Sequence, residues 1–140
     1  EVVNNSALGS FNKAFEPVWT KCDWLTKDES FVDAYIANPL KQYRFTVNGY
    51  YYMFRGIRYC QRQENLNKIP KDLPILVISG EQDPVGEFGK GPKMVADIYR
   101  NNNIKDVTLK LYPGDRHEIL NELDKEVVDH DLLNWMLERM

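Results

Sequence analysis

Two residues that could transfer protons each follow a predicted strand. Asp83 comes after the apolar run Ile75–Ile78, and His117 comes after the alternating segment 107–112. If these segments are neighbouring parallel strands, their carboxyl ends meet at one edge of the sheet and the two side chains lie close together. A carboxylate beside an imidazole fixes the ring tautomer and stabilises the imidazolium that forms when the ring takes up a proton. The placement therefore predicts an acid–base pair, two of the three members of a Ser-His-Asp triad.

Ordinary structural roles also account for each residue taken alone. An aspartate before a proline, as in Asp83-Pro84, is often only a turn residue. A single histidine in a loop is more often structural or exposed than catalytic. The order along the chain, acid and then histidine after consecutive strands, matches the order of the triad members in α/β hydrolases and favours the functional interpretation.

The C-terminal side, residues 70–140, contains the elements that must position this pair. Residues 74–79 form a short apolar run, typical of a strand that is covered on both faces in a parallel sheet. A helical stripe from Met94 to Tyr99 comes next, and a half-exposed strand follows over 107–111. A last helix is predicted from about Lys125 to Glu138. Strand, helix and strand in this order indicate a right-handed parallel crossover.

The N-terminal side, residues 1–69, is predicted to consist of loops and helices. Thr26 and Glu29 have the spacing of a capping box at the start of a helix that ends before Pro39. A second helix is predicted from about Asn48 to Gln61. One face of it carries the residues Tyr50, Met53, Phe54 and Ile57. Further tyrosines elsewhere on this helix indicate burial on more than one side, or the wall of an apolar cleft.

The apolar face of this second helix has two interpretations. Ordinary packing against the sheet would explain it, and so would an apolar acyl pocket over an active site. On the second interpretation the substrate-binding residues are Tyr50, Met53, Phe54 and Ile57.

Two parallel strands alone do not make a stable sheet. A strand as apolar as Ile75–Ile78 requires neighbours on both sides, and the sequence supplies only one clear neighbour. The chain also begins with Glu1 and not with methionine. We therefore expect the fold to be completed by upstream sequence, a missing N-terminal half, or by another copy of the chain.

Composition excludes several classes of function. The 140 residues are 43% hydrophobic, and 18 basic against 21 acidic residues give a net charge of −3, so a nucleic acid partner is not expected. No segment is long and apolar enough for a transmembrane span, and no signal peptide is visible. Two cysteines do not make a disulfide framework or a four-cysteine zinc site, which favours a cytoplasmic location.

Motifs for metals and cofactors do not fit either. A zinc-protease motif beginning at His117 would need a second histidine where Asn121 stands. The glycines at 86, 89 and 91 do not have the spacing of a nucleotide-binding fingerprint. We therefore expect no metal and no cofactor.

Two segments resemble a known enzyme family. Residues 75–85, ILVISGEQDPV, are similar to the acid-bearing strand and loop of α/β hydrolases in the serine aminopeptidase, monoacylglycerol lipase and lysophospholipase group. Residues 111–122, LYPGDRHEILNE, are similar to the histidine loop of that group. The resemblance implies that Asp83 is the triad acid and His117 the triad base. It also implies that residues 1–69 are the cap and residues 70–140 the C-terminal β-α-β-α part of the core.

One departure from the family pattern is large, because no Gly-x-Ser-x-Gly motif occurs in the sequence. The expected fold class is therefore α/β, a partial α/β-hydrolase fold in which this chain supplies the acid, the base and the cap. The resemblance implies an esterase or lipase whose substrate is a small ester or lipid, such as a monoacylglycerol or a lysophospholipid. Two alternatives stay open: a non-catalytic fragment or strand-exchanged oligomerisation module, and a parent enzyme that cleaves peptides or amides.

Overall fold

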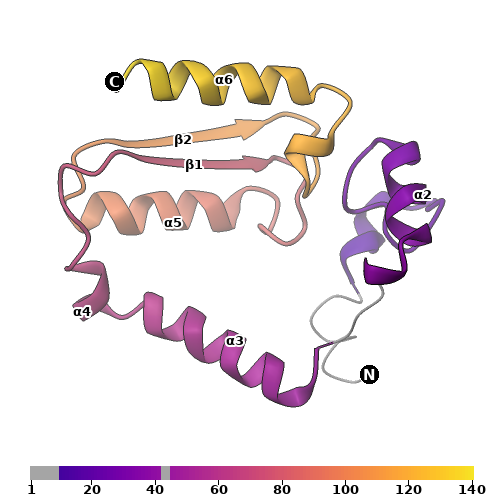
Figure 1. The fold of residues 1–140 in the computed structure, drawn as a ribbon, viewed down its shortest axis with the longest axis horizontal. Helices are drawn as coiled ribbons and strands as arrows, with labels where there is room; N and C mark the ends of the chain where they lie inside the picture. The colour runs from indigo at the N-terminus through magenta and orange to yellow at the C-terminus, as the bar shows by residue number, and fades with distance from the viewer. Residues whose placement is uncertain (1–9, 42–44) are drawn as a thin grey trace.

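A parallel two-stranded sheet forms the centre of the computed structural model, which describes residues 10–41 and 45–140. Strand β1 (Ile75–Gly80) pairs with β2 (Val107–Tyr112), with Ile75 opposite Val107 and Gly80 opposite Tyr112. Helix α5 (Lys90–Asn101) connects the strands and covers one face of the sheet, and helix α6 (Lys125–Leu137) lies on the other face (Figure 1). The predicted strand–helix–strand–helix order is confirmed, as is the parallel crossover.

The core lies between the sheet and α6. Tyr112, Ile119 and Val128 are buried together, and Ile78 and Leu132 pack against them. Ile119 belongs to the short 3-10 helix η3 (Ile119–Asn121), so the segment that follows β2 is anchored to the core before α6 begins. The prediction that the run Ile75–Ile78 is covered on both faces is met only in part, because these residues are half-buried among the described part of the chain.

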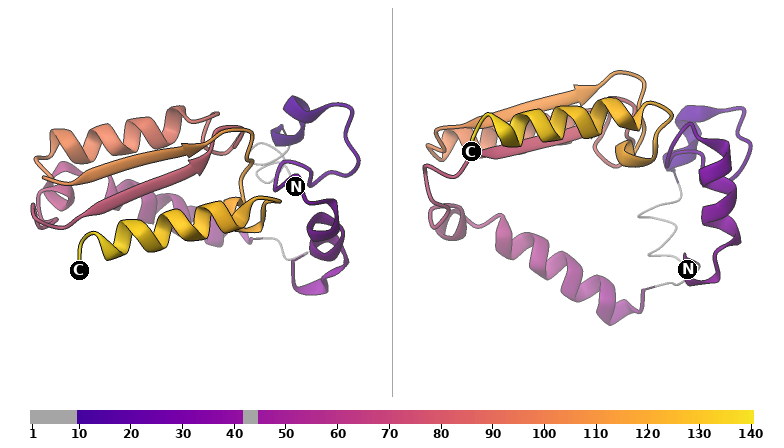
Figure 2. Two further views of the ribbon diagram at one scale, coloured as in Figure 1. Left: turned by 90° about the horizontal axis from the view of Figure 1, so that it is seen from above. Right: turned by 45° about the horizontal axis from the view of Figure 1, so that its top comes forward.

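The N-terminal elements lie beside the carboxyl ends of the two strands. They are η1 (Phe11–Phe15), α2 (Glu29–Ala37) and η2 (Pro39–Lys41), and Figure 2 shows them at the same end of the sheet in both views. The predicted capping box is wrong, because Asp28 caps α2 and accepts a hydrogen bond from the Phe31 N–H at 3.1 Å. Buried Thr26 donates its hydroxyl to the Asn121 carbonyl oxygen at 2.9 Å, so that hydroxyl serves a long-range contact.

Helix α3 (Val47–Cys60) stands apart from the sheet and leads into the short helix α4 (Gln63–Leu66) (Figure 1). Its predicted span is confirmed, and it begins where the Thr46 side chain accepts a hydrogen bond from the Gly49 N–H at 3.1 Å. Of the two alternatives predicted for α3, burial on more than one side is wrong, since Tyr50 is its only buried residue, and the wall of an apolar cleft stays a prediction. The physical reason is that amphipathic spacing marks an apolar face without specifying what covers it. Among the described residues, no helix combines the length and apolarity that crossing a membrane requires.

Candidate active site

Asp83 is fixed by the tight loop that follows β1. The Asp83 N–H donates to the Gly80 carbonyl oxygen at 3.3 Å, and the Asp83 carbonyl oxygen accepts from the Phe88 N–H at 2.8 Å. The carboxylate oxygen Oδ1 also accepts from the Val85 N–H at 2.8 Å. Asp83 is only 6% exposed. These backbone contacts hold the carboxylate in one place, and Oδ1 can still accept a second hydrogen bond.

Gly80 allows the loop after β1 to touch the loop after β2. A Cβ atom at Gly80 would lie 2.1 Å from the Arg116 carbonyl oxygen and 2.3 Å from that of Asp115, so any side chain there would collide with backbone. The two loops are joined by a hydrogen bond from the Gln82 N–H to the Asp115 carbonyl oxygen at 2.8 Å. This close approach of backbones brings the residue after Arg116 to Asp83.

That residue is His117, and its ring forms the predicted pair with Asp83. The distance between His117 Nδ1 and Asp83 Oδ1 is 3.1 Å. The hydrogen bond that the ring donates to Asp83 raises the pKa of His117, helped by the negative charges of Asp83 and Glu118 and opposed by burial. The imidazole is 36% exposed, so the ring can still be reached from outside. A histidine held at Nδ1 by a carboxylate can take up a proton through Nε2, which is the function of a general base.

Trp24 adds a contact that the sequence did not predict. Its ring lies 5.1 Å from the His117 ring, centroid to centroid, with the planes tilted by 43°. The backbone of Trp24 also contacts the histidine, because the His117 N–H donates to the Trp24 carbonyl oxygen at 3.4 Å. The next residues form a shorter bond, from the Glu118 N–H to the Leu25 carbonyl oxygen at 2.7 Å. The loop between η1 and α2 therefore contacts the candidate base directly.

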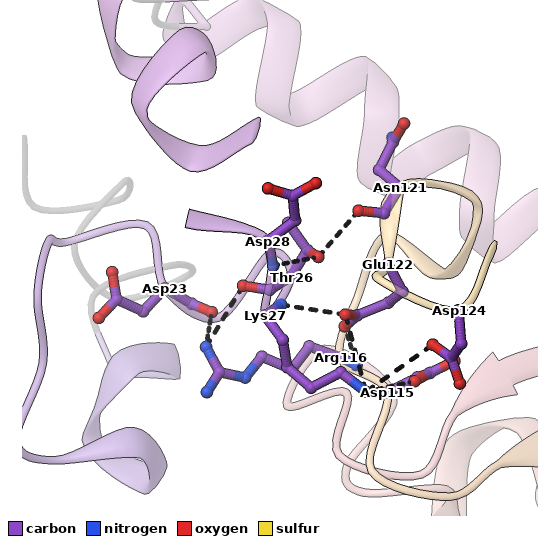
Figure 3. A network of polar contacts seen from close by, with 9 residues as sticks. All are labelled: Asp23, Thr26, Lys27, Asp28, Asp115, Arg116, Asn121, Glu122 and Asp124. Atoms are coloured by element: carbon purple, nitrogen blue, oxygen red, sulfur yellow. Dashed lines mark hydrogen bonds and ion pairs between the residues drawn. The ribbon is translucent and has the colours of Figure 1, made fainter. Parts of the chain in front are cut away.

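A network of polar contacts, partly buried, lies beside this contact, as Figure 3 shows. Glu122 Oε1 accepts from the Arg116 N–H at 2.8 Å, and Oε2 accepts from the Lys27 N–H at 3.0 Å. The Lys27 ammonium donates to Asp115 Oδ1 at 2.7 Å. The Arg116 guanidinium donates to the carbonyl oxygens of Asp23 and Thr26 and lies 4.2 Å from the centre of the Phe15 ring.

The network has an internal cation. Asp115, Glu122 and Asp124 bring carboxylate oxygens within 4.8 Å of one another, which is close enough for a metal ion. However, the Lys27 ammonium already lies 2.7, 3.8 and 3.9 Å from these three carboxylates. Burial lowers the pKa of Lys27, but the hydrogen bond to Asp115 and the surrounding negative charges raise it overall. Burial raises the pKa of Asp115 in spite of Lys27. A lysine ammonium thus holds the position that a metal ion would take.

The four residues predicted to bind substrate lie together on α3. Tyr50 and Phe54 stack with ring centroids 6.2 Å apart and planes at 20°, which places them on one face of the helix. Tyr50 is buried, while Met53, Phe54 and Ile57 are exposed. The structure thus brings Asp83 and His117 into direct contact and keeps the apolar residues of α3 as a separate cluster.

Comparisons with known proteins give a consistent assignment. A sequence profile described as "Serine aminopeptidase, S33" matches residues 4–124. The chain is 27% identical over 118 residues to a monoacylglycerol lipase of Mycolicibacterium smegmatis, and 30% identical over 90 residues to a monoglyceride lipase of Saccharomyces cerevisiae. The crystal structure of a thermostable carboxyl esterase from Bacillus coagulans superimposes with a TM-score of 0.87 at 26% identity over 98% of this chain. A lipase in its open form, with a TM-score of 0.74 at 22% identity, shares the fold.

The matches cover much more of this chain than of the relatives. They include 84% and 61% of this chain but 40% and 28% of the two lipases, and 45% of the esterase. The chain therefore spans less than half the length of the relatives that it matches.

Proposed function

The chain belongs to the serine aminopeptidase family S33, and from this membership we propose that it supplies the acid and the base of a serine hydrolase acting on carboxylic esters. The observation that carries the proposal is the 3.1 Å contact between Asp83 and His117 at the ends of two adjacent parallel strands. In this proposal residues 1–69 form the cap, and residues 70–140 form the C-terminal part of the core.

The proposed mechanism uses His117 twice. Nε2 first takes the proton from a serine hydroxyl as the serine oxygen attacks the ester carbonyl carbon. The ring then gives this proton to the departing alcohol, and an acyl-enzyme is left. In the second half His117 takes a proton from water, whose oxygen attacks the acyl carbon, and the proton returns to the serine as the free acid leaves. Asp83 holds Nδ1 and stabilises the imidazolium in both halves.

The serine nucleophile is proposed to come from sequence outside these 140 residues. No Gly-x-Ser-x-Gly motif occurs in the chain. The buried Ser79 hydroxyl donates to the Gly80 carbonyl oxygen at 3.2 Å, so this serine is engaged within β1. The missing N-terminal half of the hydrolase is thus the partner that this proposal requires.

For the substrate we infer an ester with an apolar acyl chain, such as a monoacylglycerol or a lysophospholipid. Two relatives are named as lipases of monoglycerides, and a third is a carboxyl esterase. Tyr50, Met53, Phe54 and Ile57 would line the acyl pocket, since they form an apolar face whose members are mostly exposed. A cytoplasmic location stays a prediction of the sequence.

A second candidate is cleavage of a peptide or amide, which the description of the family favours. The triad chemistry is the same for both bonds, so the substrate pocket decides between them. Matched ester and amide substrates with the same acyl group, assayed side by side, distinguish the two candidates.

The test is His117→Ala in the protein that joins this chain to its upstream sequence. Turnover of an ester should fall by a factor of about 10⁴ or more, because the base of the triad is lost. The matched control is His130→Ala on α6, the only other histidine of the chain, which should keep wild-type turnover. Labelling with a fluorophosphonate, read by intact mass, locates the nucleophile.

Two results would contradict the proposal. One is wild-type turnover in His117→Ala. The other is a protein without esterase or amidase activity that forms oligomers as its concentration rises, as a strand-exchanged oligomerisation module would.

A further inference from the structure

The histidine loop (residues 113–122) and the cap segment (residues 23–28) are tied together by one buried carboxylate. Glu122 is 1% exposed, and its two oxygens accept from the N–H groups of Arg116 and Lys27 at 2.8 and 3.0 Å. We propose that Glu122 is a positioning residue for His117 and that the Lys27–Asp115 ion pair completes the clamp. This inference rests on the proposed function of His117 as a general base.

The hydrogen bond from the Arg116 N–H to Glu122 lies directly beside His117 in the chain. Arg116 directly precedes His117, so fixing the Arg116 N–H fixes the peptide from which the histidine side chain departs. A carboxylate that accepts backbone N–H groups makes charge-assisted hydrogen bonds, which are about twice as strong as neutral ones. Because Glu122 is buried, removing the carboxylate leaves two N–H groups that bulk water does not reach as it would at the surface.

The second part of the clamp holds the cap segment in the same place. The Lys27 ammonium lies 2.7 Å from Asp115 Oδ1, and Asp115 is fully buried two residues before His117. Trp24 adds its ring contact and its carbonyl oxygen to His117 itself. Glu122 Oε2 and the Lys27 ammonium therefore join the two segments, while Glu122 Oε1 fixes the histidine loop itself, and a displacement of the cap segment would displace the imidazole relative to Asp83.

A merely structural role would lower stability without changing the imidazole of the folded protein. A positioning role changes the Asp83–His117 hydrogen bond, which keeps the pKa of His117 raised. The charged groups that act on this imidazole are Asp83, from the loop after β1, and Glu118, from the histidine loop. Neither is altered by a substitution at Glu122, so a change in the His117 pKa would report the geometry of the pair.

The decisive variant is Glu122→Gln, which keeps the shape of the side chain but replaces one accepting oxygen with an NH₂ group. The matched control is Asp124→Asn, in the same carboxylate cluster, where the carboxylate is half-exposed and 3.9 Å from Lys27. The measurements on the protein with its upstream sequence are kcat, KM, thermal unfolding and the NMR titration of the His117 imidazole. His117→Gln assigns the imidazole signal by its loss.

For Glu122→Gln we expect kcat to fall by about 10-fold to 100-fold with KM unchanged, because the base is misplaced relative to the bound substrate. The pKa of His117 should move down toward the ordinary histidine value, and Asp124→Asn should leave both quantities at wild type. A folded Glu122→Gln protein with wild-type kcat and an unshifted His117 pKa would overturn the inference.

A second pair of variants covers the case in which Glu122→Gln does not fold. Lys27→Met removes the ammonium, so kcat and the His117 pKa should fall below their wild-type values. Lys27→Arg keeps a cation, so both quantities should return toward wild type. Equal values in both variants would overturn the inference. The NMR titration needs no activity, so it still tests the clamp if His117→Ala shows that the proposed function is wrong.

Discussion

The histidine loop and helix α3 belong to one chain but are held in opposite ways. The loop is fixed by short polar contacts between buried groups, among them Glu122 and the fully buried Asp115. Helix α3 instead presents Met53, Phe54 and Ile57 as exposed apolar side chains and buries only Tyr50. The chain therefore holds Asp83 and His117 together with its own residues, whereas the apolar face of α3 is open to a ligand or to another part of the protein.

Among the substitutions that test this difference between the two regions, Asp83→Asn is expected to lower activity the most. The amide cannot stabilise the imidazolium as the carboxylate does, so kcat/KM on an ester should fall by about 10⁴-fold. The base must be neutral to act, so activity is lost below the pKa of His117. Since the hydrogen bond that the imidazole donates to Asp83 raises that pKa, its removal should move the acid limb of the pH–rate profile to lower pH. An acid limb at its wild-type pH would contradict the coupling of Asp83 and His117.

The coupling of Asp83 to His117 also makes the free energy of unfolding depend on pH. A histidine whose pKa is higher in the folded state stabilises the fold below its unfolded pKa, and this contribution is lost as pH rises through the folded pKa. The free energy lost in Asp83→Asn, measured by urea unfolding, should therefore be larger at acidic than at alkaline pH. Equal losses at both would indicate that Asp83 does not act through the charge of His117.

Gly80→Ala is expected to have the next largest effect. The new Cβ would lie 2.1 Å from the Arg116 carbonyl oxygen, so the loops after β1 and β2 must separate. We expect a loss of about 3 kcal/mol in the free energy of unfolding, measured in urea, together with a loss of activity. The control is Gly56→Ala in α3, where a Cβ meets nothing within 4 Å and the helix should gain up to about 1 kcal/mol. Losses of equal size in both variants would contradict the difference between the two regions.

The sequence was sufficient to predict the parts of this structure that depend on local patterns. The strands β1 and β2, the helices between and after them and the meeting of Asp83 with His117 follow from periodicity and from the rule that ligands gather at strand ends. The span of α3 followed from its apolar spacing in the same way. These patterns are short in sequence, so no knowledge of distant partners was needed.

The contacts that no local pattern records could not be predicted. Glu122 and Lys27 are 95 residues apart, and a side chain that accepts a distant backbone N–H leaves no periodic signal. The same reason explains the wrong capping box, because the Thr26 hydroxyl is used by the Asn121 carbonyl oxygen. For α3 the apolar face was predicted correctly, but its burial depends on what lies against it, which the helix sequence alone does not contain.

Phe54→Ala is the prediction with the smallest expected effect, and it tests the other side of the comparison. If the exposed face of α3 lines an acyl pocket, removing the ring should lower kcat/KM for a long-chain ester by about 10-fold and leave an acetyl ester almost unchanged. The control is Tyr52→Ala, another aromatic position of α3, and residues two apart on a helix do not share a face. The two side chains are 51% and 62% exposed, so loss of exposed aromatic surface alone would affect both variants alike.

The ratio of the two esters therefore separates a pocket from simple packing. Packing would lower the activity of Phe54→Ala on both esters by the same factor, since a destabilised or displaced helix does not distinguish acyl chains. A pocket would change only the long-chain ester, and only in the variant on the Tyr50–Phe54 face. Equal losses on both esters, or the same change in Tyr52→Ala, would remove α3 from the substrate site, and the Asp83–His117 pair would then be the part of the site that this chain defines.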